Sequence, residues 1–235
     1  MEKKWINLVF IIDESGSMYS SQQDVVGGFK KMIEEQRKVK DGKLTVSLFT
    51  FNNKVNKKYI GVDVNEIDDF EYYPGGMTAL YDAACESIDN VGKWLYEKDK
   101  NGEEMPSKTI VCIMTDGEEN SSVKYNLKDI RERLERQEKV YDWAFVYLGN
   151  DLSDAKDVNL LGDSVKYRGF TTKKKFYNNY DIISTGLTAY RCAATLSDAS
   201  LALNKSLTES VNTLNTEYKA DTGIDLTDNN VNGSV

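Results

Sequence analysis

The sequence predicts an α/β fold with a mainly parallel central sheet, helices on both faces, one antiparallel edge strand and a long C-terminal helical segment. Short runs of consecutive apolar residues, typical of strands buried on both faces, alternate with stretches in which apolar residues recur every three or four positions. The 235 residues are 40% hydrophobic and 29% charged, which is the composition of an ordinary folded domain. Because strands that alternate with helices form βαβ units, the sheet is expected to be Rossmann-like.

The first half of the chain contains three predicted strands. Residues 6–12 are almost all apolar and stop at Asp13. A helix is expected next, since apolar residues recur at helical spacing from Val25 to Ile33. Residues 44–51 and 55–62 then alternate as two strands, and the turn between them is so short that they must be antiparallel. The second of the two is therefore expected at an edge of the sheet.

Helices and strands continue to alternate in the second half. The patterns predict a helix over residues 80–95, a strand over 109–114, a helix over 127–134 and a strand over 143–148. From residue 176 onward, one apolar stripe at helical spacing predicts a long helix or a pair of helices; its members are Leu196, Leu203, Leu207, Val211, Leu214 and Tyr218.

These patterns divide the chain into three parts. We expect a domain core over residues 1–175, a helical segment over 176–218 that packs on or extends the core, and a flexible tail over 219–235. The apolar run near the N-terminus is too short for a signal-peptide core with its cleavage site or for a membrane span. We therefore expect a cytoplasmic protein that does not bind membranes.

Composition excludes several kinds of chemistry. The chain contains no histidine, so Ser-His-Asp catalysis and histidine-ligated zinc, iron or copper are ruled out. A net charge of -8 argues against a nucleic-acid-binding protein. Cys85, Cys112 and Cys192 lack the close spacing of a metal or redox pair and lie in apolar stretches. We expect them to be buried thiols in a reducing compartment.

Two of the predicted parallel strands end in acidic, glycine-containing turns. Residues 13–17 (Asp-Glu-Ser-Gly-Ser) follow the first strand, and residues 115–119 (Thr-Asp-Gly-Glu-Glu) follow the strand over 109–114. In open α/β sheets, ligands bind at the carboxyl ends of strands where the winding direction reverses. If the strand after the hairpin lies beside the first strand, both turns face one crevice, and the loop that carries Thr78 can close its third side.

The side chains at these positions offer only oxygen ligands. Ser15, Ser17 and Thr78 carry hydroxyl groups, while Asp13 and Asp116 carry carboxylates. An all-oxygen set with two carboxylates suits a hard divalent cation, with Mg²⁺ as the first candidate and Mn²⁺ or Ca²⁺ behind it. The sequence therefore predicts a metal site at this end of the sheet.

Together, these motifs resemble the metal-ion-dependent adhesion site of von Willebrand factor A domains. The matching features are Asp-x-Ser-x-Ser after the first strand, a threonine preceded by Gly-Gly, and Thr-Asp-Gly after the fourth strand. The resemblance covers all five metal-site positions of the family and the order of elements over residues 6–148. Without a signal sequence or a second module, the chain is similar to bacterial or bacteriophage members rather than to secreted adhesins.

The resemblance implies a role for each residue. Ser15, Ser17 and Thr78 would bind the metal directly. Asp13 and Asp116 would act through water or by hydrogen-bonding the ligands. Because neutral hydroxyls leave the ion electron-poor, an Asp or Glu of a partner protein would complete its coordination. We therefore expect a metal-dependent protein-binding module and not an enzyme, with the partner and the oligomeric state left open.

Two other functions stay open. A magnesium-dependent hydrolase or phosphoryl-transfer enzyme would use Asp13 beside the ion, but aspartyl nucleophiles usually have a second Asp two residues on, where this chain has Ser15. The glycine-rich phosphate loop with Lys and Ser/Thr and the Gly-x-Ser-x-Gly motif are also missing. The other alternative is a structural component of a larger assembly, such as a virion or a stress-response or chelatase-like complex. In related A domains the last helix can shift when the metal site is occupied. The C-terminal stripe is therefore expected to act as such a switch, to dock a partner or a second copy of the chain, or simply to pack against the sheet.

Overall fold

The computed structural model describes residues 4–68, 70–150, 158–172 and 175–225. The strands are β1 (Trp5–Asp13), β2 (Lys43–Phe51), β3 (Val55–Asp63), β4 (Lys108–Met114), β5 (Ala144–Gly149) and β6 (Tyr167–Phe170). The helices are α1 (Gln22–Lys38), α2 (Leu80–Lys100), α3 (Leu127–Tyr141), α5 (Asn178–Cys192) and α6 (Leu196–Thr222), with short 3-10 helices η1 (Gly16–Ser21) and η2 (Val64–Glu66). The five strands predicted from the sequence are all present.

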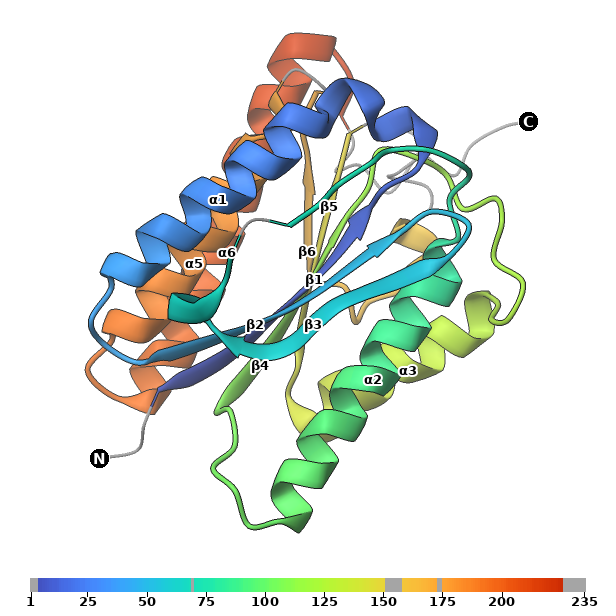
Figure 1. Ribbon diagram of the computed structural model, residues 1–235. Helices are drawn as coiled ribbons and strands as arrows, with labels where there is room; N and C mark the ends of the chain where they lie inside the picture. The colour runs from blue at the N-terminus through green and yellow to red at the C-terminus, as the bar shows by residue number, and fades with distance from the viewer. Residues whose placement is uncertain (1–3, 69, 151–157, 173–174, 226–235) are drawn as a thin grey trace.

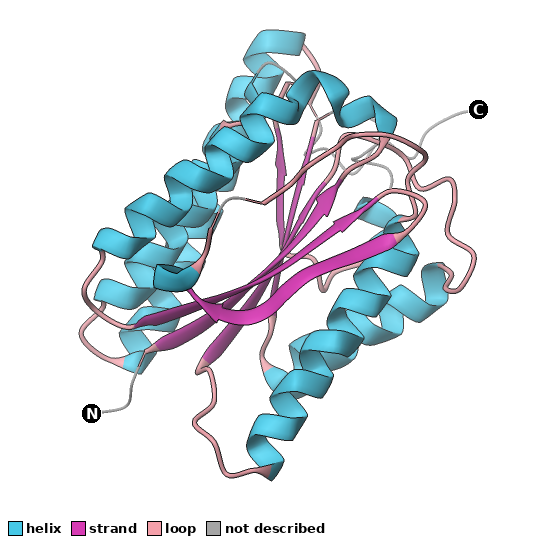
Figure 2. Ribbon diagram, in the orientation of Figure 1, coloured by secondary structure: helices cyan, strands magenta, loops and turns pink. Residues whose placement is uncertain are grey.

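The strands form one sheet in the order β3-β2-β1-β4-β5-β6. Every neighbouring pair is parallel except β2 and β3, so β3 is an antiparallel edge strand. The sheet lies between two layers of helices: α1, α5 and α6 cover one face, and α2 and α3 cover the other (Figures 1 and 2). The predicted α/β class, the antiparallel edge strand and the long C-terminal helical segment are confirmed.

Strand β1 explains why the first apolar run is continuous. All nine of its residues are buried. Ile6, Leu8 and Phe10 pack into the apolar cluster on the α1 side, whereas Val9 and Ile11 pack into the cluster on the α2 side. Because successive side chains of a strand point to opposite faces, a strand covered on both faces needs apolar residues at almost every position.

The C-terminal segment is a pair of helices packed on the sheet. Helix α5 lies against α1, where a side-chain carbon at Gly28 would come within 2.4 Å of the Tyr180 ring. Close contact between the two helices therefore depends on the missing side chain at Gly28. The stripe predicted for α6 is buried from Leu203 to Tyr218. The helix continues to Thr222, beyond the start of the expected tail, and residues 226–235 of that tail lie outside the described residues.

Strand β6 was not predicted, because its sequence, Tyr-Arg-Gly-Phe, has neither an apolar run nor a regular alternation. The Thr171 N–H donates to Gly149 O on β5, so the alternate residues Arg168 and Phe170 direct their backbone polar groups away from the sheet. Asn215 of α6 forms hydrogen bonds with the backbone of both residues. The Phe170 N–H donates to Asn215 Oδ1 and Asn215 Nδ2 donates to Arg168 O, each at 2.9 Å. One side-chain amide thus replaces a neighbouring strand at the edge.

Replacing Asn215 by alanine is expected to lower the free energy of unfolding by about 1–2 kcal/mol, because the substitution leaves two backbone groups of β6 without their partner. The measurement is urea denaturation of both proteins. Asn212→Ala, an exposed substitution on the same helix, is the matched control and should change stability by less than about 0.5 kcal/mol. Equal losses in the two variants would contradict the edge role of Asn215.

The cysteine prediction holds for two residues and is wrong for the third. Cys85 and Cys112 are buried thiols, and burial raises the pKa of Cys85 to about 12. Cys192 is exposed, because it is the last residue of α5, where the chain turns toward α6 and the apolar stripe has ended. Among the described residues, no helix is both long enough and apolar enough to cross a membrane.

Candidate functional site

The predicted site lies at the carboxyl ends of β1 and β4. These strands are direct neighbours, with Ile12 paired to Met114, so the turns that follow them meet at one end of the sheet. The winding direction also reverses here, because β2 lies on one side of β1 and β4 on the other. The adjacency expected from the sequence is confirmed, and it places the site at the point where open α/β sheets bind ligands.

Asp13 lies buried at the bottom of the site. Its Oδ1 accepts from the Ser15 N–H at 2.7 Å, and its Oδ2 accepts from Thr115 Oγ1 at 2.6 Å. The hydroxyl of Tyr72 donates to its backbone carbonyl. Burial raises the pKa of Asp13 to about 6, although the hydrogen bonds from Thr115 and Ser15 oppose the shift. The nearby negative charge of Asp116, itself buried, raises this pKa further.

The two serines that follow Asp13 present their hydroxyls together. Ser15 Oγ and Ser17 Oγ lie 2.9 Å apart. Between them, the Gly16 N–H donates to Gly76 O at 3.0 Å, which ties this turn to the loop before α2. Ser15 is buried and Ser17 is exposed, so the pair runs from the interior of the site to solvent.

Thr78 is held by the loop that follows β4. Its N–H donates to Asn120 Oδ1 at 2.8 Å, and its carbonyl oxygen accepts from the Asn120 N–H at 3.0 Å. The side chain is buried. These two hydrogen bonds therefore hold the loop before α2 and the loop after β4 together at Thr78.

Gly117 shows how closely the oxygens gather. A side-chain carbon at this position would lie 3.1 Å from Thr78 Oγ1, 3.2 Å from Ser17 Oγ and 3.7 Å from Asp13 Oδ2. Three oxygens from two separate segments, the turn after β1 and the loop before α2, thus surround one small space, which stays open because residue 117 has no side chain. Ser15 Oγ lies next to this group of oxygens, because it is 2.9 Å from Ser17 Oγ.

This donor set fits a hard divalent cation. Ions such as Mg²⁺ prefer hydroxyl, carboxylate and water oxygens, and two carboxylates balance the charge of one divalent ion. In the part of the chain that the structure describes, no three Asp, Glu, Cys or His side chains form a metal-binding group. An ion bound here must therefore take hydroxyl oxygens as ligands.

Several residues that shape the site were missed by the sequence analysis. Besides Tyr72 and Asn120, Asp82 of α2 accepts hydrogen bonds from the backbone N–H groups of Val123, Lys124 and Tyr125, at 2.8–3.3 Å. This carboxylate holds the loop that follows Asp116. Between 41 and 59 residues separate the partners in these contacts, and no local pattern reports contacts over such a distance.

Comparison with known proteins finds structural matches only. No protein-family profile matches the chain, and no curated protein matches it. The von Willebrand factor domain of a type V pili tip protein from Porphyromonas gingivalis aligns with a TM-score of 0.55 at 8% identity, over 84% of this chain and 100% of that one. A von Willebrand factor type A protein from Catenulispora acidiphila aligns with a TM-score of 0.52 at 12% identity, over 80% of this chain and 43% of the other.

A third match is proximal thread matrix protein 1 from the mussel byssus, with a TM-score of 0.53 at 15% identity over 77% of this chain and 46% of that one. The chain thus spans less than half the length of the mussel and Catenulispora proteins. At these identities the matches establish the fold alone, and the fold is that of von Willebrand factor A domains.

Proposed function

We propose that this chain is a protein-interaction module that holds a divalent cation, with Mg²⁺ as the first candidate and Mn²⁺ or Ca²⁺ behind it. The hydroxyls of Ser15, Ser17 and Thr78 would contact the ion. Asp13 and Asp116 would act through water or by hydrogen-bonding these ligands. The ion would then take a carboxylate from an Asp or Glu of a partner protein. The observation that carries the proposal is the convergence of side-chain oxygens around Gly117.

The surroundings of Asp13 favour binding over catalysis. An aspartyl nucleophile needs a carboxylate oxygen that can reach a substrate, but both oxygens of Asp13 already accept hydrogen bonds, from the Ser15 N–H and from Thr115 Oγ1. The side chain is also buried. We therefore place Asp13 in a supporting role and favour a binding module over a phosphoryl-transfer enzyme.

Exposed apolar side chains near the site support a protein partner. Tyr19 and Tyr73 are 74% and 68% exposed, and Met77 is also exposed. Tyr19 follows Ser17 within η1, and Met77 directly precedes Thr78. Exposed aromatic residues and methionine are enriched in protein interfaces. These three residues are the proposed apolar contacts around the captured carboxylate.

Two further parts of the proposal concern the setting of the protein. The free thiols of Cys85, Cys112 and Cys192 are in keeping with the cytoplasmic location that we propose. A role as a component of a larger assembly is a second candidate. It is favoured by the names of two structural neighbours, a pili tip protein and a byssus thread matrix protein.

The metal site is tested by calorimetric titration of the full chain with MgCl₂ and with MnCl₂. Thermal unfolding is then measured with and without each ion. We expect one site and a rise in melting temperature, because an ion that binds only the folded state stabilises it. Ser15→Ala and Thr78→Ala should each weaken binding at least about tenfold. Ser20→Ala, an exposed serine of η1, is the matched control and should bind as the wild type does. The absence of both heat and thermal shift would overturn the proposal.

The partner is tested by co-purification in Mg²⁺ followed by mass spectrometry. Capture should be lost with excess chelator and in Ser15→Ala, and it should be restored when Mg²⁺ is returned to the wild type. A partner that stays bound in chelator and in Asp13→Ala would contradict metal-dependent capture. Steady turnover of a phosphate ester that is abolished by Asp13→Asn would favour the enzyme instead.

A further inference from the structure

A groove lies at the end of the sheet opposite to the candidate metal site. Its walls are the second half of α2, the segment over residues 105–109 and the end of α3, and its volume is about 710 Å³. Strand β4 begins at this groove and ends at the metal site, so the length of the strand separates the two. Pockets for small molecules commonly span about 300–1,000 Å³. We call this feature the α2–α3 groove.

The groove exposes aromatic surface above an apolar floor. Ile88 and Trp143 are buried residues that line it from below. Tyr96 and Tyr141, which also line it, are 63% and 54% exposed. Large exposed apolar side chains gathered in one hollow commonly mark a binding site, whereas such residues scattered singly do not.

Gly92 keeps the middle of the groove open. A side-chain carbon at this position would meet only Gln137 Nε2, at 4.0 Å, which is an ordinary contact. The φ angle of Gly92 is not positive, so a larger residue is compatible with the backbone. The groove is therefore open at this point because residue 92 of the helix has no side chain.

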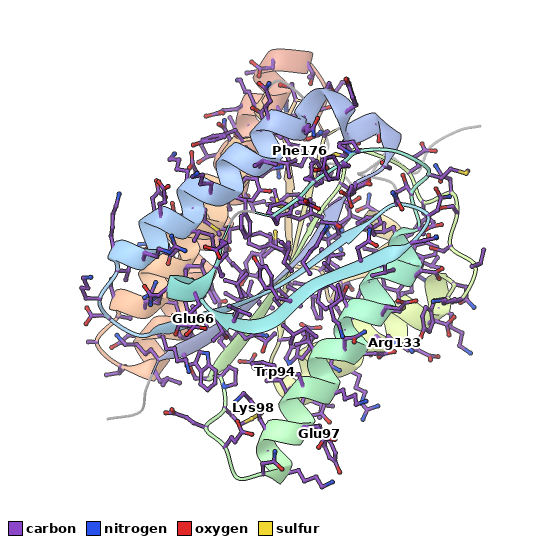
Figure 3. All side chains as sticks on the ribbon, in the orientation of Figure 1. Glu66, Trp94, Glu97, Lys98, Arg133 and Phe176 are labelled. Carbon is purple, nitrogen blue, oxygen red and sulfur yellow. The ribbon has the colours of Figure 1, made fainter. Side chains whose placement is uncertain are left out.

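The charges along the groove are unbalanced. Asp89 of α2 forms an ion pair with Arg133 of α3 at 3.0 Å, and Figure 3 labels Arg133 where these helices lie side by side. One turn further along each helix, Lys93 and Arg136 line the groove. Both are exposed, and neither forms an ion pair or hydrogen bond with any residue that the structure describes.

The other charged residues of the groove do not compensate these two cations. Lys108 is already paired, with its Nζ 2.6 Å from Asp142 Oδ2. The carboxylate of Asp99 also lines the groove, but it lies six residues beyond Lys93, which is about 9 Å along the helix axis. The groove therefore combines exposed aromatic surface above an apolar floor with two cations that pair with no anion among the described residues.

We propose that the α2–α3 groove binds a small aromatic carboxylate. The ring would pack between Trp143 and the two exposed tyrosines, where apolar surface is already open to solvent. The carboxylate would lie between Lys93 and Arg136, whose guanidinium suits a planar anion. The inference does not depend on the proposed metal-dependent function, since the two sites share no residue.

The test uses 2-naphthoate as the probe and uncharged 2-naphthamide as its matched control, each titrated into the full chain by calorimetry. All titrations contain EDTA, so that metal at the other site does not contribute. We expect one site for naphthoate, with affinity at least about fivefold higher than for naphthamide because of the two cations. Gly92→Leu should abolish binding of both compounds by filling the groove. Leucine also has a higher helix propensity than glycine, so the melting temperature should not fall.

A charge variant distinguishes the contribution of the carboxylate to binding from that of the ring. Lys93→Glu should remove the preference for naphthoate over naphthamide and leave naphthamide binding unchanged. Lys128→Glu, an equal change of charge at an exposed lysine outside the groove, should leave the preference intact. The proposal is overturned if neither compound binds at millimolar concentration, if Gly92→Leu binds naphthoate like the wild type, or if the preference survives in Lys93→Glu.

Discussion

Replacing Arg191 by methionine is expected to lower the free energy of unfolding by about 3 kcal/mol, which is one of the largest single effects that the structure predicts. Arg191 lies near the end of α5 and is buried. Its guanidinium donates to the backbone carbonyls of Gln36, Val39, Asp41 and Gly42, at 2.8–3.3 Å. It therefore closes the end of α1 and the turn into β2.

The physical reason is the number of acceptors that one side chain satisfies. The last carbonyl groups of a helix have no partner within the helix, and a cation at that end is also favoured by the helix dipole. Methionine matches much of the apolar stem of Arg191 but donates no hydrogen bond. Lysine should recover only part of the loss, because an ammonium group cannot span carbonyls that are arranged for a planar fork.

The measurement is urea or thermal denaturation of the full chain. The matched control is Arg136→Met, the same substitution at an exposed arginine that makes no hydrogen bond with the described residues. It should change stability by less than about 0.5 kcal/mol. If Arg191→Met were as stable as Arg136→Met, the role of Arg191 in holding α1 to β2 would be refuted.

Replacing Gly117 by alanine is expected to weaken Mg²⁺ binding by about a hundredfold or more while the protein stays folded. The new methyl group would lie 3.1 Å from Thr78 Oγ1 and 3.2 Å from Ser17 Oγ, in the space that the proposed ion needs. The φ angle of Gly117 is not positive, so alanine is compatible with the backbone there.

Calorimetry with MgCl₂ on the wild type and the variant measures this effect, and the melting temperature in EDTA reports whether the fold is intact. Gly75→Ala is the matched control, because a side-chain carbon there would meet no atom within 4 Å although the residue lies in the loop that leads to Thr78. Wild-type affinity in Gly117→Ala would show that no ion binds between these hydroxyls, even if one binds elsewhere.

Much of the fold was predictable because its signals are local. The apolar runs that became β1 and β4 are buried on both faces, and the turn between β2 and β3 is too short for anything but an antiparallel pair. The candidate site was predictable for a related reason. Apart from Thr78, which lies in the loop before α2, its residues lie at or just after the ends of β1 and β4, and parallel strands present those ends at the same edge of a sheet.

Other features were not predictable because they depend on contacts between distant segments. Strand β6 has no sequence pattern of its own and is defined by pairing with β5 and by the amide of Asn215. Arg191 reads as an ordinary surface cation in sequence, yet it is buried because four carbonyls from another part of the chain surround it. Cys192 lies in an apolar stretch but is exposed, since the helix ends at that residue.

By itself, the sequence determined the alternation of strands and helices, the antiparallel edge and the residues at the ends of β1 and β4, because periodicity and turn length act over a few residues. Only the tertiary structure decided that Thr78, Ser17 and Asp13 surround Gly117 and that Asn215 closes the edge of β6. It also decided that Lys93 and Arg136 line a groove with exposed aromatic surface, where neither pairs with any residue that the structure describes. These arrangements arise when packing of the whole chain brings distant segments together, and a pattern of neighbouring residues does not report contacts between segments that lie far apart in the sequence.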